Sequence, residues 1–188
     1  MEKVIWSLPT SVDVNGTTYA IRSDFRAVLD ILTALSDNDL NEQDKAETAL
    51  EIFYPDFDEM PPSDYQEALN QCFRFIDCGE EQKQKKKEPV LMSWEQDFNI
   101  IISPVNRIAG CEVRAIEHLH WFTFLSYYRE IGDCLFAQVV RIRDKKAHGK
   151  ALDKQDREFY RRNRDIIDLK TNYTEAEKDV LAAWGISK

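Results

Sequence analysis

The sequence predicts a mainly α-helical protein that begins with a short β-hairpin. Apolar residues recur at helical spacing through most of the 188 residues, and helix-capping residues precede these stretches. One Asn-Gly pair, near the start of the chain, lies between two segments of alternating character. We therefore expect a helical domain of seven or eight helices in addition to the hairpin. A chain of this length buries roughly 70% of its unfolded surface, which is enough for a core without disulfides.

The hairpin comes first. Residues 11–14 and 17–21 alternate between apolar and polar side chains around Asn15-Gly16, and this pair is the strongest short-range signal for a two-residue hairpin turn. Residues 4–6, with the sequence Val-Ile-Trp, are a candidate third strand.

Three helices are predicted after the hairpin. Ser23 is expected to cap the first and Asn41 the second, while Ser63 and Gln66 have the spacing of a capping box for the third. The loop 54–62 separates the second helix from the third and should be non-helical because of its prolines.

A charged segment over residues 80–92 is the candidate domain boundary. Its first ten residues, EEQKQKKKEP, contain no apolar side chain, which predicts an exposed connector. Residues 1–79 then hold the hairpin and acidic helices, and residues 93–188 form a C-terminal helical part with an aromatic core helix. One continuous domain is the alternative.

Capping signals also place the helices of the C-terminal part. Ser93 should cap the first, and Pro104 should kink or break it because proline removes a hydrogen-bond donor. A later helix is expected to end at Gly149, Asp153 caps the next, and a capping box at Thr174 begins the last.

An aromatic helix is predicted over about residues 113–131. Residues 121–128 read W-F-T-F-L-S-Y-Y, and a helix that is apolar on most sides must be covered by other parts of the protein. We expect it to be the most buried element, with most of the following side chains inaccessible to solvent: Trp121, Phe122, Phe124, Leu125 and Tyr128.

Sequence motifs of catalysis are missing. The chain has no G-x-G-x-x-G, Walker, G-x-S-x-G or H-E-x-x-H sequence. The acidic residues of loop 54–62 are expected to be solvated, whereas acid–base catalysis needs carboxylates whose pKa values are driven apart by burial. These residues by themselves therefore indicate no catalytic site and do not identify a function.

Metal ligation is not expected either. His118 and His120 are two residues apart, so on a helix they point about 200° from one another and cannot share an ion. We expect one to point outward and the other to form an internal hydrogen bond. The four cysteines form no C-x-x-C pair and are expected to be reduced and mostly buried.

The chain also lacks the sequence features of a membrane or secreted protein. No signal-peptide pattern is found at its start, and no apolar run approaches the roughly 18 residues of a membrane span. We expect a soluble protein of the cytoplasm.

Charge is strongly divided along the chain. Residues 37–81 contain fourteen Asp and Glu against two Lys and Arg, whereas residues 141–164 contain ten Lys and Arg against four Asp and Glu. The basic segment 141–164 is the candidate for nucleic-acid binding, because Phe159 and Tyr160 are interleaved with its cations. Two observations oppose this interpretation. The net charge of the protein is -9, and cations near a helix C-terminus are also common where no nucleic acid binds, because they stabilise the helix dipole.

Five strings in the second half of the chain carry a resemblance to a known family. They are Trp94-Glu95-Gln96-Asp97, Leu119-His120-Trp121, Phe136-Ala137-Gln138-Val139-Val140-Arg141-Ile142-Arg143, Lys145-Lys146-x-x-Gly149-Lys150-x-Leu152-Asp153 and Glu158-Phe159-Tyr160-Arg161. In this order they resemble the bacteriophage gene-product-15 family of tailed phages and prophages of Gram-positive bacteria. The resemblance extends over most of the chain.

The resemblance implies a helical tail assembly chaperone or adaptor in the host bacterial cytoplasm that is not an enzyme and uses no cofactor. Its partners would be the phage tape-measure protein and, as a second candidate, the tail-tube protein. A nucleic-acid-binding phage protein that uses residues 141–164 and a structural tail component are the alternatives. A chaperone for a helical client needs an apolar groove with charged rims. The candidate partner-binding residues are His120, Trp121, Phe124, Tyr128, Arg141, Arg143, Lys145, Lys146, Arg161 and Arg162.

Overall fold

The computed structural model describes residues 7–79 and 88–170. The candidate strand at residues 4–6, most of the charged connector and the helix predicted after Thr174 lie outside the described residues. The predicted domain division at residues 80–92 therefore stays a prediction.

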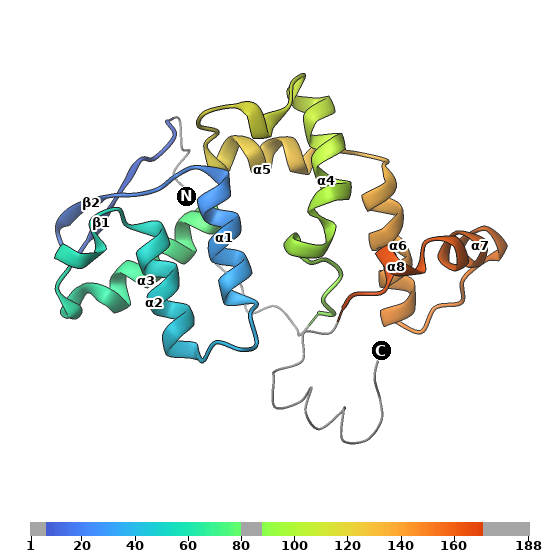
Figure 1. The fold of residues 1–188 in the computed structure, drawn as a ribbon, viewed down its shortest axis with the longest axis horizontal. Helices are drawn as coiled ribbons and strands as arrows, with labels where there is room; N and C mark the ends of the chain where they lie inside the picture. The colour runs from blue at the N-terminus through green and yellow to red at the C-terminus, as the bar shows by residue number, and fades with distance from the viewer. Residues whose placement is uncertain (1–6, 80–87, 171–188) are drawn as a thin grey trace, which may run out of the picture.

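Helices dominate the described residues, which confirms the mainly α class (Figure 1). The strands are β1 (Ser11–Val14) and β2 (Thr17–Ala20). The α-helices are α1 (Phe25–Leu35), α2 (Glu42–Phe53), α3 (Tyr65–Ile76), α4 (Trp94–Ala109), α5 (Trp121–Arg129), α6 (Leu135–Ala147), α7 (Lys154–Arg162) and α8 (Arg164–Ile167). Three short 3-10 helices are η1 (Phe57–Glu59), η2 (Pro62–Asp64) and η3 (Val113–Ala115). The hairpin and α1–α3 form one end of the molecule, α6–α8 form the other, and α4 and α5 lie between them.

The hairpin turn forms where the sequence predicts it. Strands β1 and β2 pair antiparallel, and Val14 faces Thr17 across the turn. Asn15 and Gly16 have φ angles of 52° and 87°, the positive values that a tight hairpin turn requires and that Asn and Gly tolerate best. The Asn15 side chain donates a 2.9 Å hydrogen bond to Asp64, which fixes the hairpin against the start of α3.

Local capping signals placed most helix starts correctly. Asn41, Ser93 and Asp153 cap α2, α4 and α7, and each side-chain oxygen accepts a backbone N–H of the first turn. The predicted cap of α1 is wrong by one residue. Asp24 is the cap, and its carboxylate accepts the N–H groups of Arg26 and of Leu119, so a tertiary contact selects it.

The predicted capping box at Ser63 and Gln66 is also wrong. Ser63 lies inside η2, and α3 begins at Tyr65 without a side-chain cap. The preceding loop was expected to be non-helical, but it contains η1 and the start of η2. Pro62 favours this 3-10 turn because its fixed φ suits the first position of a helix and it has no N–H to satisfy.

Helix α4 runs through Pro104 without a break, so the predicted alternative of a broken helix is wrong. Pro104 is buried together with Ile101, Ile102 and Val105. Packing of this apolar face offsets the one backbone hydrogen bond that proline cannot donate, since most helix stability in proteins comes from such packing. The helix ends at Gly110, whose φ of 71° is left-handed.

The aromatic helix is much shorter than predicted. Residues 113–115 form η3, and α5 begins only at Trp121. The Phe25 N–H donates to the Leu119 carbonyl at 2.9 Å, and the Trp121 N–H donates to the Ser23 carbonyl at 2.8 Å. Residues 119–121 thus pair with the segment before α1 as neighbouring strands do. Their backbone groups are therefore not available for the hydrogen bonds of a longer helix.

Burial of α5 is also less complete than expected. Trp121 and Phe124 are buried. Phe122, Leu125 and Tyr128, which were also expected to be inaccessible, are half-buried. Helix α4 has more buried residues than α5, so the prediction that the aromatic helix is the most buried element is wrong.

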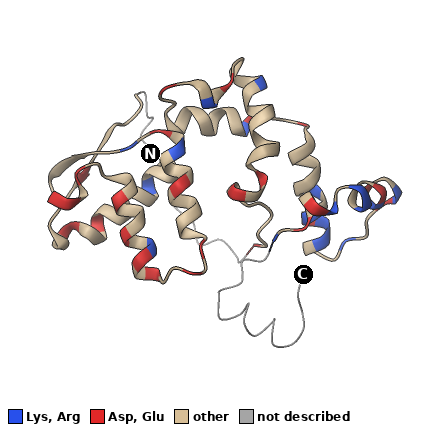
Figure 2. Cartoon of the chain, in the orientation of Figure 1, with Lys and Arg blue, Asp and Glu red and all other residues tan. Residues whose placement is uncertain are grey.

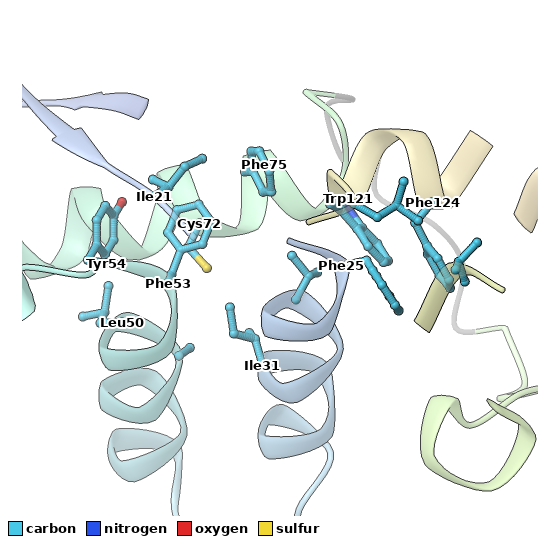
Figure 3. Close-up of a cluster of buried hydrophobic side chains, with 14 of the residues drawn as sticks. Ile21, Phe25, Ile31, Leu50, Phe53, Tyr54, Cys72, Phe75, Trp121 and Phe124 are labelled. Carbon is cyan, nitrogen blue, oxygen red and sulfur yellow. The ribbon is translucent and has the colours of Figure 1, made fainter. Parts of the chain in front are cut away.

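The main hydrophobic core joins both halves of the chain (Figure 3). It includes Val14, Phe25 and Phe53 from the first half and Ile101 and Trp121 from the second. A second, smaller cluster holds α6 to α8 and consists of Val139, Ile142 and Ile167.

Candidate functional site

Two of the aromatic candidates lie inside the core. Trp121 is 2% exposed and donates its indole N–H to the Ile76 carbonyl at 2.9 Å, and Phe124 is 0% exposed and stacks on Phe25 with 4.5 Å between ring centroids. Tyr128 is half-buried, and its hydroxyl donates to the Met92 sulfur at 3.3 Å. In this structure these rings join α5 to α1, α3 and α4.

His120 is buried as well and caps α5. Its Nδ1 accepts the Phe122 N–H at 3.1 Å, so its Nε2 carries the proton and donates to the Pro9 carbonyl at 2.9 Å. Burial lowers the pKa of His120 below its ordinary value of 6.5. His118 is exposed and lies 3.2 Å from the Ser23 hydroxyl. The expectation of one inward and one outward histidine is therefore confirmed.

Arg143 is a buried cation with a complete set of partners. Its guanidinium forms two hydrogen bonds of 2.6 and 2.8 Å with Asp97 of α4, and both residues are 5% exposed or less. It also donates to the carbonyls of Leu91, Ile166 and Ile167. Arg143 thus ties α6 to α4, to α8 and to the segment before α4.

Three further basic candidates are held by carboxylates of their own chain. Arg141 and Lys145 both contact Asp156, a buried carboxylate at the start of α7, at 2.7 and 2.5 Å. Lys146 contacts Asp168 and lies 4.1 Å from the centre of the Tyr160 ring. Asp168 is partly desolvated, which raises its pKa, but hydrogen bonds from Lys146 and its other neighbours outweigh this and lower the pKa to about 2.

The two arginines of α7 differ in their surroundings. Arg162 contacts Glu158 one turn earlier at 2.5 Å, while Arg161 is exposed and has no ion-pair partner within the described ranges. The same holds for Lys154 and Arg157, and these three cations at i, i+3 and i+7 share one side of α7. Figure 2 shows the charge division in space: acidic residues predominate around α2 and α3, basic residues predominate around α6–α8, and both signs occur at each end.

An apolar groove lies between α1 and α4, and none of the candidate partner-binding residues lines it. It measures about 480 Å³, and its apolar lining consists of Phe25, Leu29, Trp94 and Phe98. Each helix contributes two of these residues four positions apart, so each pair lies on one helix face. Phe25 is buried, and the other three are half-buried. We call this site the α1–α4 groove.

Charged residues form the rim of the α1–α4 groove. Arg26 is held by Asp24 at 2.9 Å and donates to the Ile116 carbonyl at 2.7 Å, and Arg114 pairs with Glu112. Asp30 and Glu95 are exposed and have no ion-pair partner among the residues that are described. The uncompensated charge at the rim is therefore negative.

The sequence predicted the helices that carry the four apolar groove residues but did not identify a groove between them. Each helix shows the local signal, an apolar pair one turn apart. The missing information was that the two pairs face each other across an open space, and this depends on how α1 and α4 pack.

The carboxylates of the acidic loop 54–62 lie at the surface. Asp56, Asp58 and Glu59 are exposed, as expected for solvated carboxylates. None of the four cysteines, all within the described residues, forms a disulfide, and only Cys72 is buried, so the expectation that most are buried is wrong. Burial raises the pKa of the Cys72 thiol to about 12. In the described part of the chain, His, Cys, Asp and Glu form no group of three or more that could hold a metal ion.

None of the described helices is long and apolar enough to cross a membrane.

Comparison with known proteins gives one family. Searches of curated proteins and of solved structures give no match. The family model described as "Bacteriophage Gp15 protein" matches residues 5–169, which include the hairpin, the α1–α4 groove and the basic helices. The chain therefore belongs to the bacteriophage Gp15 protein family.

Proposed function

We propose that this phage protein is a tail assembly chaperone or adaptor. It would act in the host cytoplasm, without catalysis, by holding a helical segment of the tape-measure protein during tail morphogenesis. The observation that carries the proposal is the α1–α4 groove, an apolar site with charged rims on a protein of the phage Gp15 family.

The size and lining of the groove support a helical client. At about 480 Å³ it lies within the usual range of binding sites, roughly 300–1,000 Å³. An amphipathic helix presents apolar side chains at i, i+3, i+4 and i+7, and helix-in-groove complexes use these as anchors. The paired apolar residues of α1 and α4 offer an apolar lining for such anchors.

The rim charges indicate which client helices fit best. Asp30 and Glu95 are uncompensated within the described residues, so they favour a client with Lys or Arg beside its apolar anchors. Acidic residues outnumber basic ones fourteen to two over residues 37–81, which include α2 and α3, and this excess favours the same kind of client beyond the groove.

Co-expression with the tape-measure protein tests this function. Thr33 lies exposed at the groove wall, so Thr33→Trp fills the groove without removing a core residue. Asn99 is exposed on α4 outside the groove lining, so Asn99→Trp is the matched control. We expect wild type and Asn99→Trp to co-purify with soluble tape-measure protein. Thr33→Trp should weaken the complex about tenfold, which corresponds to about 1.4 kcal/mol.

Two outcomes would contradict the proposal. One is a tape-measure protein that stays insoluble and forms no complex with the wild type. The other is equal recovery with both tryptophan variants, which would place the client elsewhere. Stoichiometric presence of the protein in finished virions would instead favour a structural tail component.

Nucleic-acid binding is the second candidate, favoured by the three cations of α7 that have no partner within the described residues. If Lys154, Arg157 and Arg161 contacted three phosphates of a DNA duplex, the logarithm of affinity should fall with that of salt concentration with a slope of about -2.7. Reversing the charge of Arg161 should then reduce the slope. The absence of binding at low salt would exclude this candidate.

A further inference from the structure

Helix α7 has a row of cations that the described part of the chain leaves without an ion-pair partner. The row, which we call the cationic face of α7, lies at i, i+3 and i+7 and consists of three exposed residues: Lys154, Arg157 and Arg161. By contrast, every Lys and Arg of the neighbouring helix α6 is held by a carboxylate of its own chain. The charge that this end of the molecule leaves for a partner is therefore on α7.

Helix α2 has a row of carboxylates with the same spacing. This anionic face of α2 also lies at i, i+3 and i+7 and consists of three exposed residues: Asp44, Glu47 and Glu51. None of them forms an ion pair with another described residue. The Asp44 carboxylate accepts a 2.7 Å hydrogen bond from the Asn41 side chain, and Arg22 donates to the backbone carbonyl of Glu51. The single cation of α2, Lys45, is paired with Glu42.

The two faces match in position as well as in sign. On each helix the second and third charges lie about 4.5 and 10.5 Å along the axis from the first. If α7 lies parallel to α2, all three cations meet a carboxylate at once. The pairs are then Lys154 with Asp44, Arg157 with Glu47, and Arg161 with Glu51. Complementary charges in one register are the arrangement that fixes how two surfaces dock.

The faces that match lie at opposite ends of the molecule. Helix α2 belongs to the end formed by the hairpin and α1–α3, and α7 belongs to the end formed by α6–α8 (Figure 1). One copy therefore does not pair its own two faces, whereas two copies can. A nucleic acid would neutralise the cationic face alone, and the net charge of -9 repels a polyanion. A second copy of the chain satisfies both faces.

We propose that the cationic face of α7 docks on the anionic face of α2 of a second copy. The contact joins different surfaces of the two copies, so it is head-to-tail and a further copy can add at a free end. Exposed ion pairs are individually weak, so the association is reversible, requires high protein concentration and depends on salt. It does not rest on the proposed function, because neither face lines the α1–α4 groove.

Sedimentation equilibrium of the full-length protein tests the association. At about 0.1 M salt, charges are screened beyond about 10 Å, so repulsion between net negative copies is reduced while pairs in contact still attract. We expect the average mass of the wild type to rise above the 22.0 kDa of one chain as protein concentration increases. At about 1 M salt the screening length is about 3 Å, and the mass should return to that of one chain.

Charge reversal identifies the contact and its register. Glu47→Lys or Arg157→Glu alone should weaken the association about tenfold, because one attractive pair becomes repulsive. The double variant Glu47→Lys with Arg157→Glu restores an attractive pair of opposite polarity and should associate like the wild type. Glu47→Lys with Arg161→Glu is the matched control. It has the same net charge and the same kinds of substitution, but it contains two repulsive pairs and should stay dissociated.

Several results would overturn the proposal. One is a wild type that keeps the mass of one chain at about 0.1 M salt, and DNA binding by that species would favour the nucleic-acid candidate instead. Another is association that 1 M salt does not reverse or that the single reversals leave unchanged. Equal behaviour of the two double variants would also overturn it, because the charges would then not meet in the proposed register.

Discussion

Replacing Arg143 with alanine should remove a large part of the stability of the protein. The substitution leaves Asp97 as a charge that is 1% exposed and has lost both hydrogen bonds to the guanidinium. The carbonyls of Leu91, Ile166 and Ile167 lose their donor from Arg143 as well. Removal of one partner from a buried ion pair typically costs about 3–5 kcal/mol. Total unfolding free energies are about 5–15 kcal/mol, so the loss amounts to between about a fifth of the stability and all of it.

Urea unfolding followed by circular dichroism measures this loss. Arg161→Ala is the control, because Arg161 is exposed without an ion-pair partner in the described residues and should change stability by about 0.5 kcal/mol or less. Asp97→Asn combined with Arg143→Ala should be at least as stable as Arg143→Ala alone. Asparagine removes the unpaired buried charge and keeps an oxygen for the Ser93 N–H, which donates to Asp97.

The reasoning is refuted if Arg143→Ala unfolds at the same urea concentration as Arg161→Ala. It is also refuted if the double variant is clearly less stable than Arg143→Ala, because the remaining carboxylate would then not be the source of the loss.

Three further predictions concern pH, thiol reactivity and backbone conformation. Because burial lowers the pKa of His120, the unfolded chain takes up this proton first, so unfolding free energy should fall as pH drops below about 6.5. His120→Asn keeps a capping oxygen for the Phe122 N–H and should reduce that pH dependence in urea unfolding, whereas an unchanged dependence would assign it to other groups. Cys111 is exposed and should react with a thiol reagent in the native protein, whereas Cys72, with its pKa raised to about 12, should react only on unfolding. Gly110→Ala should lower stability by about 1–2 kcal/mol through its left-handed φ alone, because no atom lies within 4 Å of the added Cβ; unchanged thermal unfolding would contradict this.

The sequence determined the elements whose signals are local. The turn at Asn15 and Gly16 and the caps at Asn41, Ser93 and Asp153 depend on backbone groups within about three residues of the signal, so they were read correctly. The mainly α class follows from the same local periodicity. Family membership could also be predicted from the sequence, because it depends on the order of motifs along the chain.

Tertiary structure decided the features that depend on segments far apart in the chain. Residues 116–120 were expected to be helical, but their backbone groups pair with the segment before α1, and the carboxylate of Asp24 joins the two. Pro104 stays inside α4 because the helix face around it is buried.

The candidate partner-binding residues show the same limit. An aromatic ring or a cation has the same sequence signature in a core, in an internal ion pair and in a binding surface. Packing placed Trp121 and Arg143 inside, and it left Leu29 and Trp94 facing each other across an open groove. The groove depends on how α1 and α4 pack in the folded protein, which no local pattern of either helix specifies.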